Sequence, residues 1–262
     1  MAALTALAAL SVLGCTRQEV RCSDEAQCGD GNGRNIDAKT SAELKLAKVT
    51  AQIKDSVSGE QSRGGEDSEK SNNLRAVNID LTVKNLGDHP AFISKATVTF
   101  DESGHLEPCY AIGGDLLSTA NYTFTIPDDQ PRKEGTLLHV TPFSISKELT
   151  HEIPPNKYEK FTLTVGPKTI PDGGSPWFGV LHITLFRDTG DGLKIGPLAV
   201  VDTGGNPAFY PEFDKNAWHI EKEHFPGCTK KNAEKISSIM AISDLTPSVE
   251  FSGLNKALQN YK

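Results

Sequence analysis

Long apolar stretches are missing from this sequence of 262 residues. Beyond the first fourteen residues, no run reaches the length of about 20 residues with which a helix crosses a bilayer. The sequence also has no CxxC pair, no GxSxG elbow and no HxxxH spacing, which removes the usual signatures of zinc sites and serine hydrolases. The formal net charge is -7, whereas a nucleic-acid-binding protein presents a basic patch. We therefore expect no nucleic-acid partner and no membrane-spanning helix beyond the first fourteen residues.

An apolar segment is present at the N-terminus, from Ala2 to Gly14. It has the length of a signal-peptide core. It ends in Val12-Leu13-Gly14-Cys15, which resembles a bacterial lipobox. The resemblance implies that residues 1–14 are a lipoprotein-type signal peptide and that Cys15 carries a diacylglycerol. No Lys or Arg precedes Cys15, unlike in most signal peptides, and a buried N-terminal helix is the alternative. We expect an exported, extracytoplasmic protein that lipid anchors to a bacterial membrane.

Four cysteines follow Cys15: Cys22, Cys28, Cys109 and Cys228. An even number in an exported chain predicts two disulfides, for which three pairings are possible. We favour Cys22 with Cys28, which are close in sequence, and Cys109 with Cys228, which would join the body of the protein to its C-terminal part. Zinc is the rival use of these thiols, but an oxidising compartment favours disulfides.

Two polar segments are predicted to be flexible. Residues 15–43 contain Gly-Asp-Gly-Asn-Gly and are expected to form a tether between the lipid and the body. Within them, residues 30–35 loosely resemble a calcium loop, but Arg34 takes a ligand position and no closing Glu follows. Residues 54–74 are rich in Ser, Gly, Glu and Lys, with Val57 as an isolated apolar residue, and they predict a disordered loop.

Alternation of apolar and polar residues is the clearest structural signal. Val77, Ile79, Leu81 and Val83 alternate with polar neighbours, which is the pattern of a strand with one buried face. Similar patterns predict other strands at 44–53 (with a bulge), 96–100, 122–126, 137–141, 145–153, 161–165, 177–186 and 193–201.

These strands suggest an architecture. The simplest arrangement makes 77–83 and 96–100 an antiparallel pair joined by a short turn. Residues 177–186 are apolar on both faces, so this strand should be central in its sheet. Seven or eight strands without a helical period predict an all-β, antiparallel, immunoglobulin-like sandwich over residues 44–202.

Residues 203–262 have a different character and predict a C-terminal extension. Thr229 is expected to cap a helix with one apolar face, and Leu254 and Leu258 predict a last helical turn. Such short helices are not stable alone. We therefore expect this partly helical extension to pack on the sandwich.

Several short motifs occur in an order that resembles an uncharacterised immunoglobulin-like β-sandwich family common in actinobacteria. They are Ile-Asp-Leu-Thr-Val-Lys-Asn-Leu-Gly at 79–87, Pro108-Cys109, Pro154-Pro155, Lys-Phe-Thr-Leu at 160–163, Leu-Phe-Arg-Asp at 185–188, and Cys228 followed by Lys231-Asn232-Ala233. The resemblance spans about residues 44–260. It implies the fold and assigns no activity or site residue.

Histidines and carboxylates that could serve catalysis or metal binding have simpler explanations. His182 lies in an apolar strand, where it is expected to be packed or at an edge. Asp188 and Asp191 could hold calcium, but a hairpin turn explains them equally well. Further possible metal ligands lie in a loop nearer the C-terminus, called the distal loop below, although solvent exposure explains them better. They are Asp214, His219, Glu221, Glu223 and His224. We predict no catalytic residue, no metal and no cofactor.

Aromatic residues indicate a possible binding surface. One candidate is the loop that begins at Tyr110, and the other contains Phe209, Tyr210, Phe213 and Trp218. Exposed aromatic clusters form binding faces, whereas buried ones form small additional cores. The apolar anchors that the C-terminal extension needs favour burial.

The sequence therefore predicts a lipid-anchored, non-catalytic binding or interaction module of the cell envelope, whose partner is an envelope protein or a glycan. One alternative is an envelope hydrolase or metal-dependent enzyme with a site built from loops, which would require a pocket with converging His and carboxylate groups. The other alternative is a structural spacer.

Overall fold

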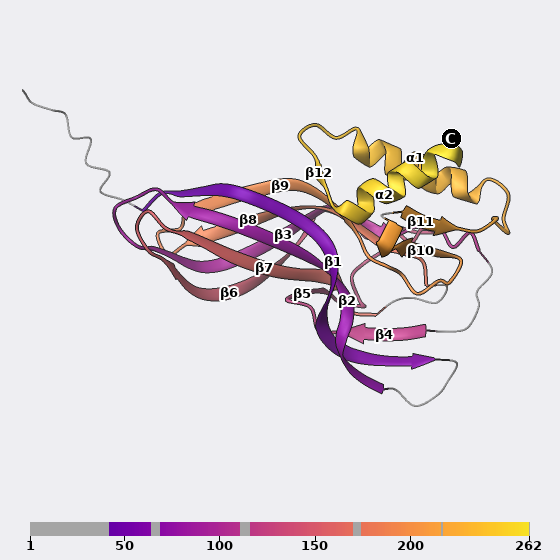
Figure 1. Cartoon of the computed structure of the whole chain (residues 1–262), viewed down its shortest axis with the longest axis horizontal. Coiled ribbons are helices and arrows are strands. Elements are labelled where there is room, and N and C mark those ends of the chain that lie inside the picture. Colours follow the sequence, from indigo (N-terminus) through magenta and orange to yellow (C-terminus); the bar gives the residue numbers. More distant parts are fainter. Residues whose placement is uncertain (1–41, 64–68, 111–115, 170–173, 216, 262) are drawn as a thin grey trace, which may run out of the picture. The chain divides into compact units, whose positions relative to one another are not determined.

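A computed structural model describes residues 42–63, 69–110, 116–169, 174–215 and 217–261, which form two five-stranded sheets and a two-stranded one (Figure 1). The first sheet has the order β4 (Leu116–Ala120), β1 (Leu44–Arg63), β2 (Glu69–Asn85), β7 (Tyr158–Pro167) and β5 (Phe124–Ile126). The second has the order β12 (Thr246–Pro247), β9 (Gly192–Val201), β8 (Trp177–Arg187), β3 (Ala91–His105) and β6 (Phe143–Ile153).

The long strands form an immunoglobulin-like sandwich. β1, β2 and β7 are neighbours in one sheet, and β9, β8, β3 and β6 are neighbours in the other. Their pairs are antiparallel. This order matches strands A-B-E on one sheet and G-F-C-C′ on the other in immunoglobulin-like domains. The prediction of an all-β sandwich is confirmed.

Burial explains why these segments are strands. Val77, Ile79, Leu81 and Val83 of β2 are at most 1% exposed and contribute to the main core between the sheets. β8 lies between β9 and β3, as its two apolar faces predict. Its residues Phe178 and Val180 pack on the opposite side, in a second core. The predicted bulge in β1 is also present, as a register shift between Leu46 and Lys48.

The predicted pairing of 77–83 with 96–100 is wrong, because the chain crosses from one sheet to the other between β2 and β3. The buried side chain of Asn85 holds this crossing. Its amide nitrogen donates to the carbonyls of His89 and Ile153 at 2.7 and 3.0 Å. Its oxygen accepts from the backbone N–H groups of Gly87 and Glu43 at 3.0 and 3.3 Å. These bonds replace a hairpin ladder at the turn.

The disordered loop predicted at 54–74 is wrong where the chain is described. β1 continues to Arg63, and β2 begins at Glu69. The two strands remain paired through this polar stretch, down to Gln61 with Glu69. A small cluster of buried residues, Val57, Leu74 and Ala76 with Tyr122 against it, supports the arm that they form, and β4 pairs with β1 along it. Backbone pairing between the strands satisfies the polar groups that a loop would leave to water.

The predicted strand at 137–141 is also wrong. Leu138 and His139 form isolated bridges with Gly104 and Arg132 instead of a continuous ladder. A Cβ on Gly104 would lie 2.7 Å from the Leu137 carbonyl oxygen. The two segments therefore approach too closely at this point for any larger residue.

The C-terminal extension is more regular than the sequence suggested. It contains a hairpin of β10 (Phe209–Glu212) and β11 (Ala217–Ile220), followed by α1 (Cys228–Met240) and α2 (Val249–Leu258). The second core joins both helices and the hairpin to β8 and β9 through residues that include Ile236, Phe251 and Leu254. None of the described helices is long and apolar enough to cross a membrane.

The disulfide between Cys109 and Cys228 is confirmed and spans 119 residues. It attaches the start of α1 to the chain that follows β3. In a chain-entropy model, closing a loop of this length stabilises the fold by about 4–5 kcal/mol. The predicted cap of α1 is wrong: Thr229 is buried within the helix, and the Glu223 carboxylate accepts hydrogen bonds from the backbone N–H groups of Gly227 and Thr229. These bonds lower the pKa of Glu223.

Candidate functional site

Three of the five aromatic residues considered as a possible binding surface are buried, which agrees with the burial that the sequence favoured for them. Tyr110, Phe209 and Trp218 are 3%, 1% and 7% exposed and belong to the second core. The Tyr110 hydroxyl is hydrogen bonded to Thr229, and the Trp218 indole donates to the carbonyl of Glu250. The C-terminal extension uses these rings as anchors.

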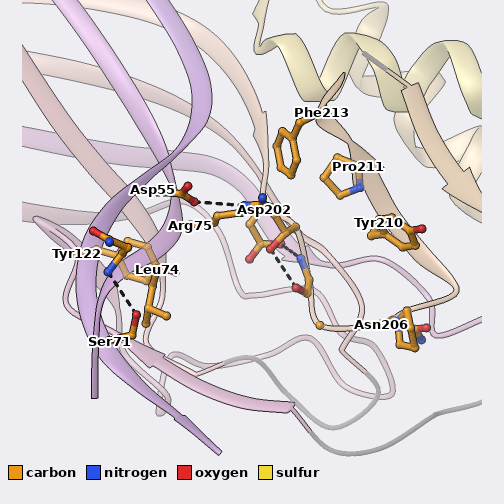
Figure 2. A pocket seen from close by; sticks show the side chains of 15 residues that line it. Asp55, Ser71, Leu74, Arg75, Tyr122, Asp202, Asn206, Tyr210, Pro211 and Phe213 are labelled. Carbon is orange, nitrogen blue, oxygen red and sulfur yellow. Dashed lines mark hydrogen bonds and ion pairs between the residues drawn. The ribbon is translucent and has the colours of Figure 1, made fainter. Parts of the chain in front are cut away.

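The other two, Tyr210 and Phe213, are each 37% exposed and line a cleft of about 490 Å³. The arm of β1 and β2 forms one wall of this cleft, and the segment 202–213 forms the other. Figure 2 shows Asp55 and Arg75 on the side of the arm, with Asp202, Pro211 and Phe213 on the side of the second wall. The cleft therefore joins segments that are far apart in the sequence.

The wall on the arm is polar because the strand pair leaves the main core there. Asp55 lies directly opposite Arg75 in the register, and the two side chains form an ion pair of 3.2 Å. Ser71 and Asn73 continue the same side of β2 toward its start. The neighbouring residue Leu74 points to the opposite side, where it is buried. Alternation along β2 thus places three polar side chains on the cleft.

The segment 202–206 of the second wall is fixed by the buried carboxylate of Asp202. Its Oδ1 atom accepts from the backbone N–H groups of Trp177 and Gly204, at 2.7 and 2.9 Å. Burial raises the pKa of Asp202 to about 7, against the opposing effect of these two hydrogen bonds. Gly204 has a φ of +58°, and a Cβ there would lie 2.3 Å from the Gly174 carbonyl oxygen. This wall therefore needs glycine at that position.

Arg75 connects the two walls. Its guanidinium lies 4.2 Å from the centre of the Phe213 ring, an arrangement that contributes about 0.5–1 kcal/mol at exposed sites. The ion pair with Asp55 is formed through the Nε atom of Arg75. Because Asp55 balances the charge of Arg75, this part of the cleft is nearly neutral. Tyr210 adds a second ring, which stacks on His219 with centroids 4.9 Å apart.

Hydrogen-bonding groups and exposed rings together suit the binding of a polar ligand with some apolar surface. None of the 15 described lining residues is a histidine. The carboxylates of the cleft are Asp55, which is ion paired, and Asp202, which binds backbone N–H groups. In the described part of the chain, no group of three His, Cys, Asp or Glu residues could hold a metal ion.

Two possible metal ligands of the distal loop lie beside each other, and a third binds backbone groups. His219 lies 3.6 Å from Glu221, and Glu223 binds the first turn of α1. Asp191 forms an ion pair with Arg187, and one Asp188 oxygen accepts from the Thr189 N–H group. The turn at 188–191 is as expected, whereas His219 of the distal loop lies in strand β11 and not in a loop.

His182 lies on the outer face of its sheet, where its Nδ1 atom is 2.6 Å from the Asp101 carboxylate. The predictions for Cys15, Cys22, Cys28, the calcium-like stretch and the tether up to residue 41 concern residues outside the described ranges, as do residues 111–115 of the loop after Tyr110.

Most cleft residues were missed from the sequence, namely Asp55, Ser71, Asn73, Arg75, Tyr122, Asp202 and Asn206. Asp55, Ser71 and Asn73 fall in the segment predicted to be disordered, and Arg75 directly follows it. A usable signal exists for the other wall: Asp202-Thr203-Gly204-Gly205-Asn206 directly follows a buried strand. Loops that follow strands and contain Gly and Asn often bring backbone groups to a ligand.

The fold and the cleft together define a β-sandwich protein with a polar, aromatic-edged cleft beside its C-terminal extension. No protein-family model matches the chain, and no curated protein matches it. Among solved structures, it is similar to the one described as "X-ray structure of Northeast Structural Genomics Consortium target SoR45". The identity is 14% and the TM-score 0.25, over 70% of this chain and 95% of that chain. At that TM-score the similarity supports no conclusion about this protein.

Proposed function

We propose that the protein is an exported, lipid-anchored module of the cell envelope that binds a glycan in the cleft and has no catalytic role. The observation that carries the proposal is the combination of exposed aromatic rings, Tyr210 and Phe213, with hydrogen-bonding side chains in one cleft. A sugar ring has an apolar face of C–H groups and a rim of hydroxyls. The negative face of an aromatic ring attracts the former, and groups such as Asn73 and Arg75 can bond the latter.

Two features support the location. The lipobox-like sequence that ends at Cys15 would supply the anchor. The bridge between Cys109 and Cys228 is of a kind that persists in oxidising compartments and is rare in the cytosol. An electrically balanced cleft, in which Asp55 neutralises Arg75, favours an uncharged glycan over a strongly ionic ligand.

Titration calorimetry with the full chain in detergent tests the binding role. The probes are neutral oligosaccharides: chitotetraose, cellotetraose, mannotetraose and xylotetraose. We expect one of them to bind, and the double variant Tyr210→Ala/Phe213→Ala to lower its affinity by about tenfold or more, since aromatic anchors dominate such sites. The matched control is Phe92→Ala/Phe225→Ala, which removes two exposed rings that are 44% and 61% accessible and lie outside the cleft.

Two results would contradict the proposal. Failure of all four probes to bind, or an equal loss in both double variants, would remove the cleft as a glycan site. Shortened sugars in the titrated sample, detected by chromatography, would show that the protein is an enzyme.

The anchor has its own test, mass spectrometry of the protein purified from its native membranes. We expect the mature chain to begin at Cys15 and to carry the mass of a diacylglycerol on that residue. An unmodified chain that still contains residues 1–14 would refute the anchor and leave the cleft unaffected.

A further inference from the structure

The outward face of the sheet of β1, β2 and β7 carries an unusual concentration of lysine. Strand register places Lys45 opposite Lys84, and Lys48 opposite Thr82, which in turn lies opposite Lys160. Lys54 lies farther along β1, opposite Ala76 of β2. Val77, Ile79, Leu81 and Val83 of β2 point to the opposite side of the sheet and are buried in the main core. These five lysines, Lys45, Lys48, Lys54, Lys84 and Lys160, are called the lysine face below.

One carboxylate on this face, that of Asp80, lies among the lysines, opposite Thr50 and Thr162. It binds Lys54 at 2.8 Å and Lys160 at 3.3 Å, and it accepts a hydrogen bond from the Thr162 hydroxyl. Burial raises its pKa, but the bonds from these three side chains outweigh burial and hold the pKa at about 2. Five positive charges against one negative charge leave the face basic in a chain whose formal net charge is -7.

The arrangement is costly for the fold. Like charges directly opposite each other on neighbouring strands are destabilising, and Lys45 and Lys84 occupy such positions. Lys84 also lies over the ring of Tyr158, 5.1 Å from its centroid. A polyanion seated on the face would relieve this repulsion.

The face is recessed along β1. A groove of about 490 Å³ is lined by side chains that include Lys48, Lys54, Lys160 and Asp80, and by Val249 at the start of α2. Its floor presents hydroxyl and amide groups of Thr50, Thr82 and Gln52. None of its lining residues lines the cleft of Tyr210 and Phe213. The groove is therefore a separate site.

We propose that the lysine face binds an extended anionic glycan, a polymer with carboxylate or phosphate groups along its length. The lysines extend from the level of Lys84 to that of Ala76 on β2, which corresponds to about 26 Å of strand at about 3.3 Å per residue. Several monomers of a linear polymer cover that length. The recess between β1 and α2 accepts a chain, whereas a flat lipid surface cannot enter it. The site does not depend on the glycan proposed for the cleft.

Binding of polygalacturonate, a carboxylated glycan, to the full chain in detergent tests the proposal, with its fully methyl-esterified and therefore neutral form as the reference ligand. We expect binding only to the charged polymer, and a steep loss of affinity between about 50 mM and about 300 mM salt, because counterions screen exposed charges. Changing Lys48, Lys84 and Lys160 to Gln should weaken binding by about tenfold or more.

The matched control changes Lys147, Lys194 and Lys230 to Gln. These lysines are exposed on β6, β9 and α1, and the change in net charge is identical. We expect less than a twofold effect. Asp80→Asn provides a test in the opposite direction: it frees Lys54 and Lys160, and should tighten binding by about twofold to fivefold. A misfolded variant would not produce such a gain.

Three outcomes would overturn the proposal. One is equal weakening by the two triple variants, which would indicate non-specific attraction. Another is the absence of polymer binding at the lowest salt concentration. The third is binding to vesicles of phosphatidylglycerol in preference to polygalacturonate, measured by sedimentation against phosphatidylcholine vesicles. If the lysine face is the site, the cleft variant Tyr210→Ala/Phe213→Ala should bind polygalacturonate like the unmodified protein.

Discussion

At the scale of single residues, the fold depends on a few buried polar groups whose hydrogen bonds are fulfilled. Asn85 is the clearest example, since it is 0% exposed and its side chain makes four hydrogen bonds to backbone groups around the crossing from β2 to β3. Asp202 has the same role at the cleft. Loss of such a side chain leaves buried backbone groups without partners, which costs about 1–3 kcal/mol each.

We expect Asn85→Ala to lower the free energy of unfolding by about 3 kcal/mol or more, because several buried N–H and C=O groups lose their partner. Urea denaturation followed by circular dichroism measures the change. The control is Asn121→Ala, which removes an exposed hydrogen bond of 3.3 Å from the Asn121 amide to the Ser58 hydroxyl. It should lower the free energy of unfolding by less than about 0.5 kcal/mol. Similar losses in both variants would mean that Asn85 does not hold the crossing.

At the scale of elements, alternation in the sequence predicts which segments are strands but not which strands are partners. The pattern at Val77, Ile79 and Leu81 identified β2 correctly, because each of these residues contacts the main core. Pairing is decided by contacts over long separations, such as that of Val77 with Val165 in β7. A short turn after a strand suggests a hairpin, whether the chain returns in the same sheet or crosses to the other sheet. The buried Asn85, which directs the chain to the other sheet, has no distinctive sequence signal.

The arm of β1 and β2 shows why the site was harder to predict than the fold. Its residues are mostly polar because it leaves the main core, and among its described residues Val57, Leu74 and Ala76 form a small separate buried cluster. Low apolar content normally indicates disorder. Here the partner strand supplies the missing hydrogen bonds, and Arg75 is brought to Phe213, far along the chain. Neither contact has a local pattern from which it could be inferred.

At the scale of the whole molecule, opposing buried groups set the response to acid. His105 and His139 are each 4% exposed, and burial lowers the pKa of both to about 4. In the unfolded chain their pKa is about 6.5. At a pH between about 4 and about 6.5, unfolding therefore takes up two protons. The stability that the neutral rings provide is complete above a pH of about 6.5 and is lost as the pH falls toward about 4. Asp202 acts in the opposite direction, since its pKa of about 7 in the folded state exceeds the ordinary 3.8.

We expect the free energy of unfolding to rise with pH between about 4.5 and about 6.5, since two protons taken up by the histidines outweigh the one released by Asp202. The net of one proton corresponds to a slope of about 1.4 kcal/mol per pH unit. In His105→Gln/His139→Gln the slope should change sign, because Asp202 then dominates. Urea denaturation at a series of pH values measures both slopes.

The control for this pH dependence is the double variant His89→Gln/His224→Gln, in which two exposed histidines are replaced. Its slope should match that of the unmodified protein. If the free energy of unfolding of His105→Gln/His139→Gln had the same slope against pH as that of the control, His105 and His139 would not govern the acid response.

The measurement that tests the central claim most directly is hydrogen–deuterium exchange of the full chain with and without the oligosaccharide that binds it. Amide exchange reports local opening and its suppression by a ligand. If the cleft is the glycan site, protection should increase in the segments 71–75 and 202–213, which form its two walls. Protection confined to any other part of the described chain, with these two segments unchanged, would contradict the account.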